Sequence, residues 1–310
     1  MFQPGKVLQP SKSDCCFFSH RPQPLHISDH SCEERQAHSN MSMEVRESRK
    51  CLEDINGTLR FKYSMLLLRN DDNEFFSARS SDPHPASNVQ LCELEDVRRI
   101  APLPSCPPGV IVAPETLANM DDTYVKRPDL LRLATTNDSQ ASLLEEVRVC
   151  EMIKRHSHPN LAEYRGCVLS EGRIIGICFK RYGETLMGKV NPGHLNKSML
   201  IEAPERAAAR KEATRYLPNI RAGLQHLHSL GIIHNDLNPM NIMIDEDDNP
   251  VIIDFDSCRV VGAPLQNVKR TYGWYNQDVG VSKESNDTEA LKEIQVFLAG
   301  SSPEDLIFSI

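Results

Sequence analysis

The segment GIIHNDLNPMNIMIDEDDNPVIIDFDSC, residues 231–258, constrains the fold and chemistry of this chain more than any other part of the sequence. Its short apolar runs predict three strands separated by polar turns. The loop after the first run contains His234, Asp236 and Asn241, and Asp254 follows the third run. The pattern therefore predicts that two carboxylates and one amide lie together beside a small hairpin.

These residue types fit phosphoryl transfer, which needs a carboxylate near the acceptor hydroxyl and oxygen ligands for Mg²⁺ on the nucleotide phosphates. The His-x-Asp-x-x-x-x-Asn spacing, with Asp254 followed by phenylalanine, resembles the catalytic loop and metal-binding aspartate of protein kinases. The resemblance implies that Asp236 orients the acceptor and that Asn241 and Asp254 hold Mg²⁺, with ATP as co-substrate. The phrases HNDxNPxNI and IIDFDSC resemble a divergent fungal-type group of protein-kinase-like proteins.

Upstream residues extend the resemblance. Lys126 ends the short apolar run TYVK, and Glu146 lies on a helix predicted over residues 142–155. In kinases, a strand lysine contacts the nucleotide phosphates and pairs with a helix glutamate, so we expect Lys126 and Glu146 to lie at the ATP site. Glu145 and Glu151 are alternative partners. The phrase HSHPNL resembles the turn that follows this helix in protein kinases.

The run KRYGETL after the strand predicted over residues 174–179 resembles the hinge between the two kinase lobes. The resemblance implies that Phe179 lies at the back of the adenine pocket. It also implies that Lys180, Arg181 and Tyr182 offer backbone groups to the adenine.

The order of predicted elements, strands first and helices later, indicates an α+β fold with two lobes. We expect a β-rich N-lobe at residues 105–182 and a truncated helical C-lobe at 183–310. Residues 1–55 are rich in polar residues and predicted to be disordered. Residues 56–104 form an extension with some β-structure.

The sequence departs from the kinase pattern at several positions. No G-x-G-x-x-G precedes Lys126, and Gly109 is the glycine at a plausible distance for the phosphate-covering loop. Asn238 stands where the catalytic-loop lysine is expected, and Asp256 stands at the glycine of D-F-G. Asn235 replaces the arginine that pairs with an activation-loop phosphate, so phosphorylation of that loop is not expected to be required.

Composition narrows the classes of partner and location. The net charge of −8 does not favour binding to nucleic acid or to an anionic membrane. The apolar runs are too short to span a bilayer. Ten cysteines without a C-x-x-C pair suggest free thiols in a reducing compartment, so an intracellular location, cytoplasmic or nuclear, is expected.

Three functions remain open at this point. The first is an ATP- and Mg²⁺-dependent protein serine/threonine kinase acting on a protein substrate. The second is a pseudokinase that serves as a binding or scaffold module, which the absent glycine-rich loop, Asn238 and the short C-lobe favour. The third is a small-molecule phosphotransferase of the aminoglycoside or choline type, which Asn235, Asn238 and Asp256 favour.

Overall fold

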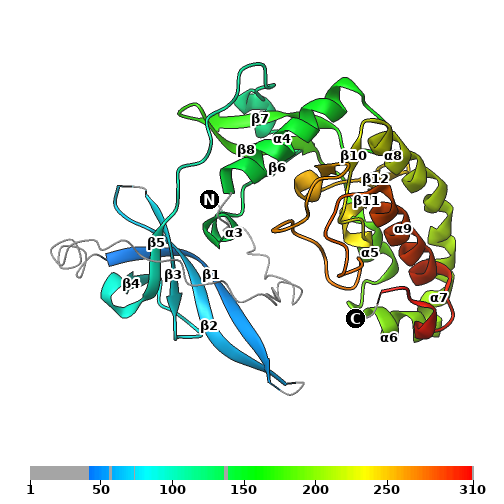
Figure 1. Ribbon diagram of the computed structural model, residues 1–310, viewed down its shortest axis with the longest axis horizontal. Helices are drawn as coiled ribbons and strands as arrows, with labels where there is room; N and C mark the ends of the chain where they lie inside the picture. Colours follow the sequence, from blue (N-terminus) through cyan, green and yellow to red (C-terminus); the bar gives the residue numbers. More distant parts are fainter. Residues whose placement is uncertain (1–41, 56–57, 73, 136–138, 309–310) are drawn as a thin grey trace, which may run out of the picture. The chain divides into compact units, whose positions relative to one another are not determined.

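The computed structural model describes residues 42–55, 58–72, 74–135 and 139–308. These residues form two compact units (Figure 1). The first unit contains the described residues up to Pro102 together with 129–135. The second contains Leu103–Pro128 and the described residues from Ser139 onward.

The first unit is built on an antiparallel sheet with the strand order β4-β1-β2-β3-β5. The strands are β1 (Ser42–Ile55), β2 (Thr58–Arg69), β3 (Phe75–Ser80), β4 (Asn88–Gln90) and β5 (Glu95–Arg99). Met43, Leu66, Leu68 and Ala78 form its buried core.

The prediction of disorder for residues 1–55 is wrong for residues 42–55, and residues 1–41 lie outside the described part. Strand β1 pairs with β2 along most of its length, from Glu44 opposite Arg69 to Ile55 opposite Thr58. Its many charged residues resemble a disordered segment in composition. The apolar residues that stabilise the strand come mainly from β2, which the composition of residues 1–55 does not reveal.

Helix α3 (Leu130–Thr135) also belongs to the first unit, although we assigned its residues to the kinase N-lobe. It contacts β2 and β3, and Leu131 is buried. Just before the helix, Asp129 Oδ2 accepts a hydrogen bond of 2.8 Å from Arg49 Nη1. Tertiary packing thus separates α3 from its neighbours in sequence.

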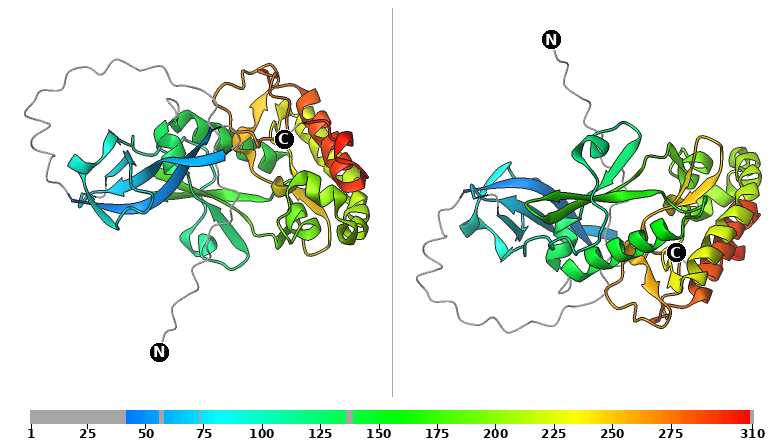
Figure 2. Two further views of the ribbon diagram at one scale, coloured as in Figure 1. Left: turned by 90° about the horizontal axis from the view of Figure 1, so that it is seen from below. Right: turned by 90° about the horizontal axis from the view of Figure 1, so that it is seen from above.

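The β-rich lobe of the second unit is a three-stranded sheet with the order β6-β8-β7. Its strands are β6 (Thr123–Lys126), β7 (Tyr164–Ser170) and β8 (Arg173–Lys180), and the short helix α2 (Glu115–Ala118) precedes β6. Helix α4 (Ser139–Arg155) contacts β7 (Figure 2). The helical spacing of Leu143, Val147 and Cys150 buries one face of α4, as the sequence predicts.

No described strand pairs with the free edge of β6, where the two strands of a glycine-rich loop would be expected. Residues 103–113 lie instead beside β7, where Ala113 N donates to Cys167 O at 2.9 Å and Cys167 N donates to Ile111 O at 2.8 Å. Gly109 lies in this segment with φ +83° and open space around it. It therefore does not form a phosphate-covering loop on the described sheet.

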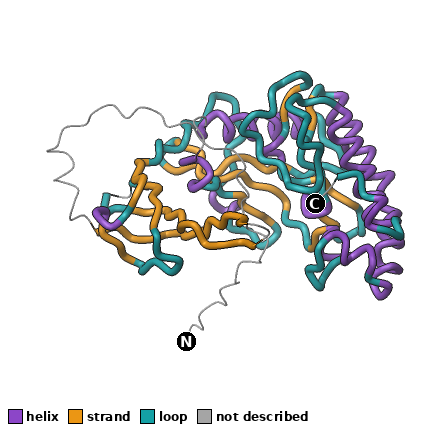
Figure 3. The backbone as a smooth tube through the Cα atoms, turned by 60° about the horizontal axis from the view of Figure 1, so that its bottom comes forward, coloured by secondary structure: helices purple, strands orange, loops and turns teal. Residues whose placement is uncertain are grey.

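The second lobe is mainly helical (Figure 3). Its helices are α5 (Leu186–Val190), α6 (Lys197–Glu202), α7 (Pro204–Ala213), α8 (Leu217–Ser229) and α9 (Glu284–Ala299). Its short strands are β9 (Glu184–Thr185), β10 (Ile232–Ile233), β11 (Ile242–Ile244), β12 (Pro250–Ile252) and β13 (Arg259–Val260). In the described residues, no helix is both long and apolar enough to cross a membrane.

A proline at position 218 must interrupt a helical region or lie in a first turn. In the structure, residues 205–230 are divided into α7 and α8, and Pro218 lies in the first turn of α8. The run SNDTEAL resembles the kinase segment whose aspartate opens a helix and ties down the catalytic loop. Asp287 does bond to the loop of His234 and Asn235, but it lies inside the first turn of α9, whose N-cap residue is Lys283, and so does not cap the helix.

Candidate active site

Lys126 pairs with two acidic side chains from different parts of the chain. Its Nζ lies 2.6 Å from Glu146 Oε1 on α4 and 2.5 Å from Asp254 Oδ1. The alternative glutamates are engaged elsewhere: Glu145 pairs with Arg148 at 2.7 Å, and Glu151 accepts a hydrogen bond from Ile111 N at 2.8 Å. The structure therefore places Glu146, and not Glu145 or Glu151, beside Lys126.

Burial and charge act in opposite directions on this group. Burial alone would lower the pKa of Lys126, but the neighbouring carboxylates raise its pKa well above the ordinary lysine value. Burial raises the pKa of Glu146 to about 7. Burial also opposes ionisation of Asp254, but Lys126 and Lys269 overcome it and hold the pKa of Asp254 well below its usual range. Asp254 therefore stays ionised and available to a cation.

The catalytic loop is attached to α9 through the buried carboxylate of Asp287. Asp287 Oδ2 accepts hydrogen bonds from His234 N and His228 Nε2, each at 2.8 Å, and Oδ1 accepts from Asn235 N at 2.8 Å. On the other side of the loop, His234 Nε2 lies 3.0 Å from Ile253 O, next to Asp254. These bonds fix the loop relative to both α9 and the strand that carries Asp254.

Asn235, at the position of the expected arginine, is a buried hydrogen-bonding centre with φ +64°. Its Nδ2 donates to Ser257 O at 3.3 Å and lies 3.1 Å from Ser282 Oγ, while its Oδ1 accepts from Asn286 Nδ2 at 2.9 Å. Neutral hydrogen bonds thus connect the catalytic loop to the segment after Asp254.

Asp236 lies among hydrogen-bond donors from its own loop and from the later segment. Asn241 Nδ2 donates to Asp236 O at 2.9 Å and lies 3.3 Å from its Oδ2. Thr271 N donates to Oδ1 at 2.6 Å, and Thr271 Oγ1 donates to Oδ2 at 3.1 Å. Burial raises the pKa of Asp236 to about 6, although the bonds from Thr271 favour its ionised form.

The segment after β12 brings a further cation and a further carboxylate to the site. Asp254 is in the left-handed region with φ +65°, a conformation that non-glycine residues seldom adopt and that is often found at functional sites. Lys269 Nζ lies 3.1 Å from Asp254 Oδ2 and 3.8 Å from Asp256 Oδ2. Lys126 also lies 4.0 Å from Asp256.

The predicted hinge residues lie at the end of β8. The Phe179 ring packs between Tyr164, at a centroid distance of 6.1 Å, and Phe255, at 6.3 Å. Two of the backbone N–H groups assigned to the adenine are already used, since Lys180 N donates to Glu163 O at 2.9 Å and Arg181 N donates to Asp122 O at 2.7 Å.

The remaining hinge side chains also have partners within the protein. Tyr182 Oη accepts from Glu163 N at 3.0 Å, and Lys180 Nζ pairs with Glu246 at 2.7 Å. Arg181 Nη2 donates to Thr123 O at 2.8 Å, which ties the hinge to β6. The roles of these residues toward adenine stay a prediction.

The donor set beside Asp254 fits Mg²⁺ carried on a nucleotide. The Asn241 amide nitrogen is used by Asp236, which leaves its oxygen as the side-chain atom suited to a hard cation. The described residues contain no group of three or more His, Cys, Asp or Glu side chains arranged to hold a metal ion. Asn241 and Asp254 would hold Mg²⁺ together with phosphate and water oxygens, which is its usual mode at kinase sites.

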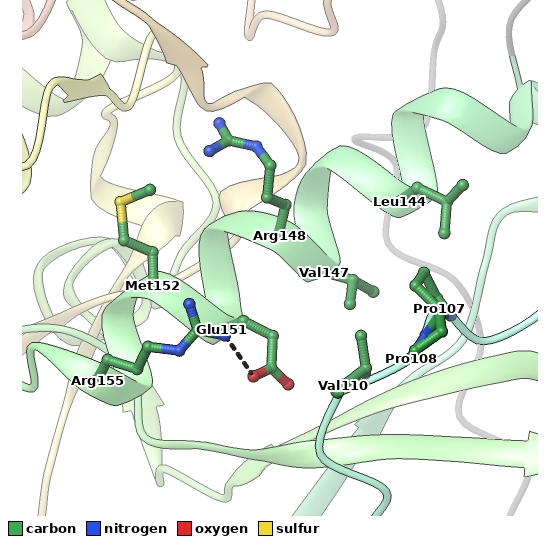
Figure 4. A pocket seen from close by; sticks show the side chains of 10 residues that line it. Pro107, Pro108, Val110, Leu144, Val147, Arg148, Glu151, Met152 and Arg155 are labelled. Atoms are coloured by element: carbon green, nitrogen blue, oxygen red, sulfur yellow. Dashed lines mark ion pairs between the residues drawn. The ribbon is translucent and has the colours of Figure 1, made fainter.

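A separate pocket lies where α4 approaches residues 107–110 (Figure 4). Val110, Val147 and Met152 contribute apolar walls, and the Arg155–Glu151 ion pair of 3.8 Å lies at the pocket. Its lining includes Gly109 and Glu151 but not Lys126, Glu146, Asp236, Asn241 or Asp254.

The sequence reasoning missed the roles of Lys269, Thr271 and Ser257 in the site. Ser257 Oγ donates to Lys269 O at 2.6 Å, and this bond folds the segment back toward Asp236. No local pattern marks these residues. The available signal was indirect: Asn238 leaves a cation missing from the catalytic loop.

Comparison with known proteins agrees with this geometry. The protein kinase domain family matches residues 129–297, which is more than half of the chain, and the chain therefore belongs to this family. The matched range includes Glu146, Asp236, Asn241 and Asp254, and it begins just after Lys126.

Individual relatives match over shorter ranges. Serine/threonine-protein kinase SSK22 of Saccharomyces cerevisiae is 26% identical over 180 residues, 57% of this chain and 12% of that protein. LIM domain kinase 1 of Drosophila melanogaster is 30% identical over 139 residues, 44% of this chain and 10% of that protein. CBL-interacting protein kinase 16 of Oryza sativa subsp. japonica is 26% identical over 139 residues, 45% of this chain and 27% of that protein. The matched segments thus span between 10% and 27% of these relatives.

Proposed function

We propose that this chain transfers the γ-phosphoryl group of ATP to serine or threonine hydroxyls of a protein substrate, with Mg²⁺ as the metal. The observation that carries the proposal is the joining of Lys126, Glu146 and Asp254 by ion pairs, next to a catalytic loop in which Asp236 and Asn241 are bonded. These contacts support a site in which Lys126 serves as the phosphate-binding cation, Asn241 and Asp254 as metal ligands and Asp236 as the base.

Each residue has a defined task in this reaction. Lys126 binds the α- and β-phosphates, and Glu146 orients the Lys126 ammonium. Asp254 and Asn241 hold Mg²⁺, which neutralises phosphate charge when bound. Asp236 orients the acceptor hydroxyl and receives its proton. A pKa of about 6 keeps Asp236 mostly ionised at neutral pH while leaving it a better proton acceptor than an ordinary aspartate.

Two observations support alternative functions. The described three-stranded sheet lacks the strands of a glycine-rich loop, and the Lys180 and Arg181 N–H groups are occupied, which favours a pseudokinase with a binding role. Asp256 lies within 4.0 Å of Lys126 and within 3.8 Å of Lys269, and an acidic residue there suits a small-molecule phosphotransferase.

The test combines binding and turnover. Calorimetric titration with Mg-ATP is expected to give saturable binding, and phosphate should appear on protein serine or threonine with wild type but not with Asp236→Ala. Asp254→Asn should weaken Mg-ATP binding at least tenfold, about 1.4 kcal/mol, because it removes a metal ligand. Asp236→Asn should mainly lower kcat, because it contacts the acceptor.

The alternatives predict different results. A pseudokinase binds nucleotide or a partner without transfer, and a small-molecule enzyme phosphorylates an aminoglycoside or choline but no protein. Equal loss of Mg-ATP affinity in Asp254→Asn and Asp236→Asn would contradict the assigned roles.

We also propose that the protein is intracellular. We further propose that its partners include neither nucleic acid nor a membrane. All seven cysteines in the described residues are free thiols, which fits a reducing compartment.

A further inference from the structure

The catalytic loop lacks a cation near the position of phosphoryl transfer. Asn238 is buried, and its Nδ2 lies 3.0 Å from Asp236 O and 3.2 Å from Thr271 Oγ1. An amide in this position can orient Thr271, but it cannot balance the negative charge of a transferring phosphoryl group.

The segment that follows Asp254 carries the Lys269 ammonium, which pairs with two carboxylates. Its Nζ is 3.1 Å from Asp254 Oδ2 and 3.8 Å from Asp256 Oδ2. Lys269 therefore lies beside the proposed metal ligand Asp254, and two residues later Thr271 bonds to the proposed base Asp236.

The backbone at and just after Lys269 has contacts with two other segments. The Lys269 carbonyl accepts the 2.6 Å hydrogen bond from the buried Ser257 hydroxyl. Two residues later, Thr271 donates from N to Asp236 Oδ1 and from Oγ1 to Asp236 Oδ2. The Lys269 side chain is 46% exposed, so its ammonium remains accessible to a ligand.

The formal charges of the site favour such a cation. Formal positive charge comes from Lys126 and Lys269. Formal negative charge comes from Glu146, Asp236, Asp254 and Asp256. A nucleotide triphosphate adds further negative charge, and a single Mg²⁺ offsets only part of it. Loss of Lys269 would leave this excess uncompensated on the side of the γ-phosphate.

We propose that Lys269 supplies the cation that the catalytic loop lacks and contacts the γ-phosphoryl group of ATP. This inference rests on the proposed function. During transfer, the bond from the acceptor oxygen to phosphorus forms and the bond from phosphorus to the ADP oxygen breaks. The acceptor proton passes to Asp236, and ADP leaves. Lys269 stabilises the charge on the non-bridging oxygens of the transferring group.

The test compares Mg-ATP and Mg-ADP, because only ATP has the γ-phosphoryl group. Calorimetry on the full chain should show that Lys269→Met weakens Mg-ATP binding about tenfold, consistent with the loss of a charge-assisted hydrogen bond. The affinity for Mg-ADP should change less than about twofold. Lys269→Arg should retain most of the affinity for Mg-ATP. Lys126→Met should weaken the binding of both Mg-ATP and Mg-ADP.

Controls separate this inference from folding and from the proposed function. Lys292→Met removes an exposed lysine of α9 and should leave both affinities unchanged, and circular dichroism should show that Lys269→Met is folded. If wild type binds neither nucleotide, the proposed function fails and this inference fails with it. If wild type binds both nucleotides and Lys269→Met binds each of them as tightly as wild type does, only the inference fails. Tighter binding of both nucleotides by Lys269→Met would show that Lys269 blocks the metal site, which also overturns the inference.

Discussion

The two sides of the candidate site are held together by different forces. On the side of α4 and Asp254, Lys126 and Lys269 link Glu146, Asp254 and Asp256 through ion pairs. On the catalytic-loop side, the contacts are mainly hydrogen bonds to backbone and neutral groups. They come from Asp287, Asn235, Asn286 and Thr271.

This difference fits the function proposed for each side. In the proposed reaction, the charged side exchanges its lysine–carboxylate pairs for contacts with phosphate and metal. The hydrogen-bonded side keeps Asp236 in one position, since buried hydrogen bonds are directional and costly to break. Mutations on the loop side should therefore lower stability more than mutations on the charged side.

Asp287→Ala should have the largest effect on stability. It leaves the buried N–H groups of His234 and Asn235 without their acceptor, and each such group costs about 1–3 kcal/mol, so we expect a loss of about 4 kcal/mol. Urea unfolding followed by the fluorescence of Trp274 measures it, because the sequence has one tryptophan and it lies in the second unit.

Glu289→Ala is the matched control on the same helix. Glu289 is partly exposed, and its replacement should change stability by no more than about 0.5 kcal/mol. A loss of less than about 1 kcal/mol for Asp287→Ala would show that the loop does not depend on this carboxylate.

Asp236 should make stability depend on pH. Its pKa in the folded protein is about 6, above the ordinary 3.8, so the folded state binds the proton more tightly than the unfolded state. The stabilisation is present below about pH 4 and is lost as pH rises through about 6, a change of about 3 kcal/mol. Asp236→Asn should remove this dependence, which urea unfolding at pH 4, 5, 6 and 7 would show. Parallel curves for the two proteins would mean that Asp236 titrates normally.

Glu146→Gln should cost little stability, which is the contrast with Asp287. Burial raises the pKa of Glu146 and so opposes its ionised form, which offsets part of the gain from its pair with Lys126. Lys126 keeps its pair with the ionised Asp254 in the variant. We expect a change of about 1 kcal/mol or less at pH 7, measured by the same unfolding assay. A loss of unfolding free energy as large as that of Asp287→Ala would show that the charged side contributes to stability as much as the hydrogen-bonded side does.

Removing any phosphate from the segment after Asp254 should have the smallest effect of these changes, measured as the rate of phosphoryl transfer. Asn235 already joins the catalytic loop to the segment after Asp254, so no phosphate–arginine pair is needed to order that segment. Ser257 is fully buried, and Arg259 and Arg270 bond to carbonyls of Asp256 and Val279. Activity before and after dephosphorylation should agree within about twofold.

Replacing Thr271 with alanine would not isolate the effect of phosphorylation on this segment. Thr271 donates two hydrogen bonds to Asp236, so its loss would act directly on the proposed base. A loss of more than about tenfold after dephosphorylation that is restored by rephosphorylation would show that a phosphate switch exists.

The sequence alone determined the residues whose chemistry depends on local spacing. The strand Thr123–Lys126, the helix that bears Glu146 and the short strands around Asp236 were all predictable, because apolar periodicity follows the local backbone repeat. The ordered spacing of Lys126, Asp236 and Asp254 was likewise sufficient to predict the family.

Only the tertiary structure decided which distant segments contact these residues and each other. Strand β1 looks disordered by composition and is stabilised by β2, and α3 packs with the first unit although its sequence neighbours belong to the second. Lys269 lies beside Asp254 in a segment that Ser257 contacts at the Lys269 carbonyl and Asp236 contacts at Thr271. Such contacts depend on long-range hydrogen bonds and ion pairs between segments far apart in the chain, and local sequence patterns do not record them.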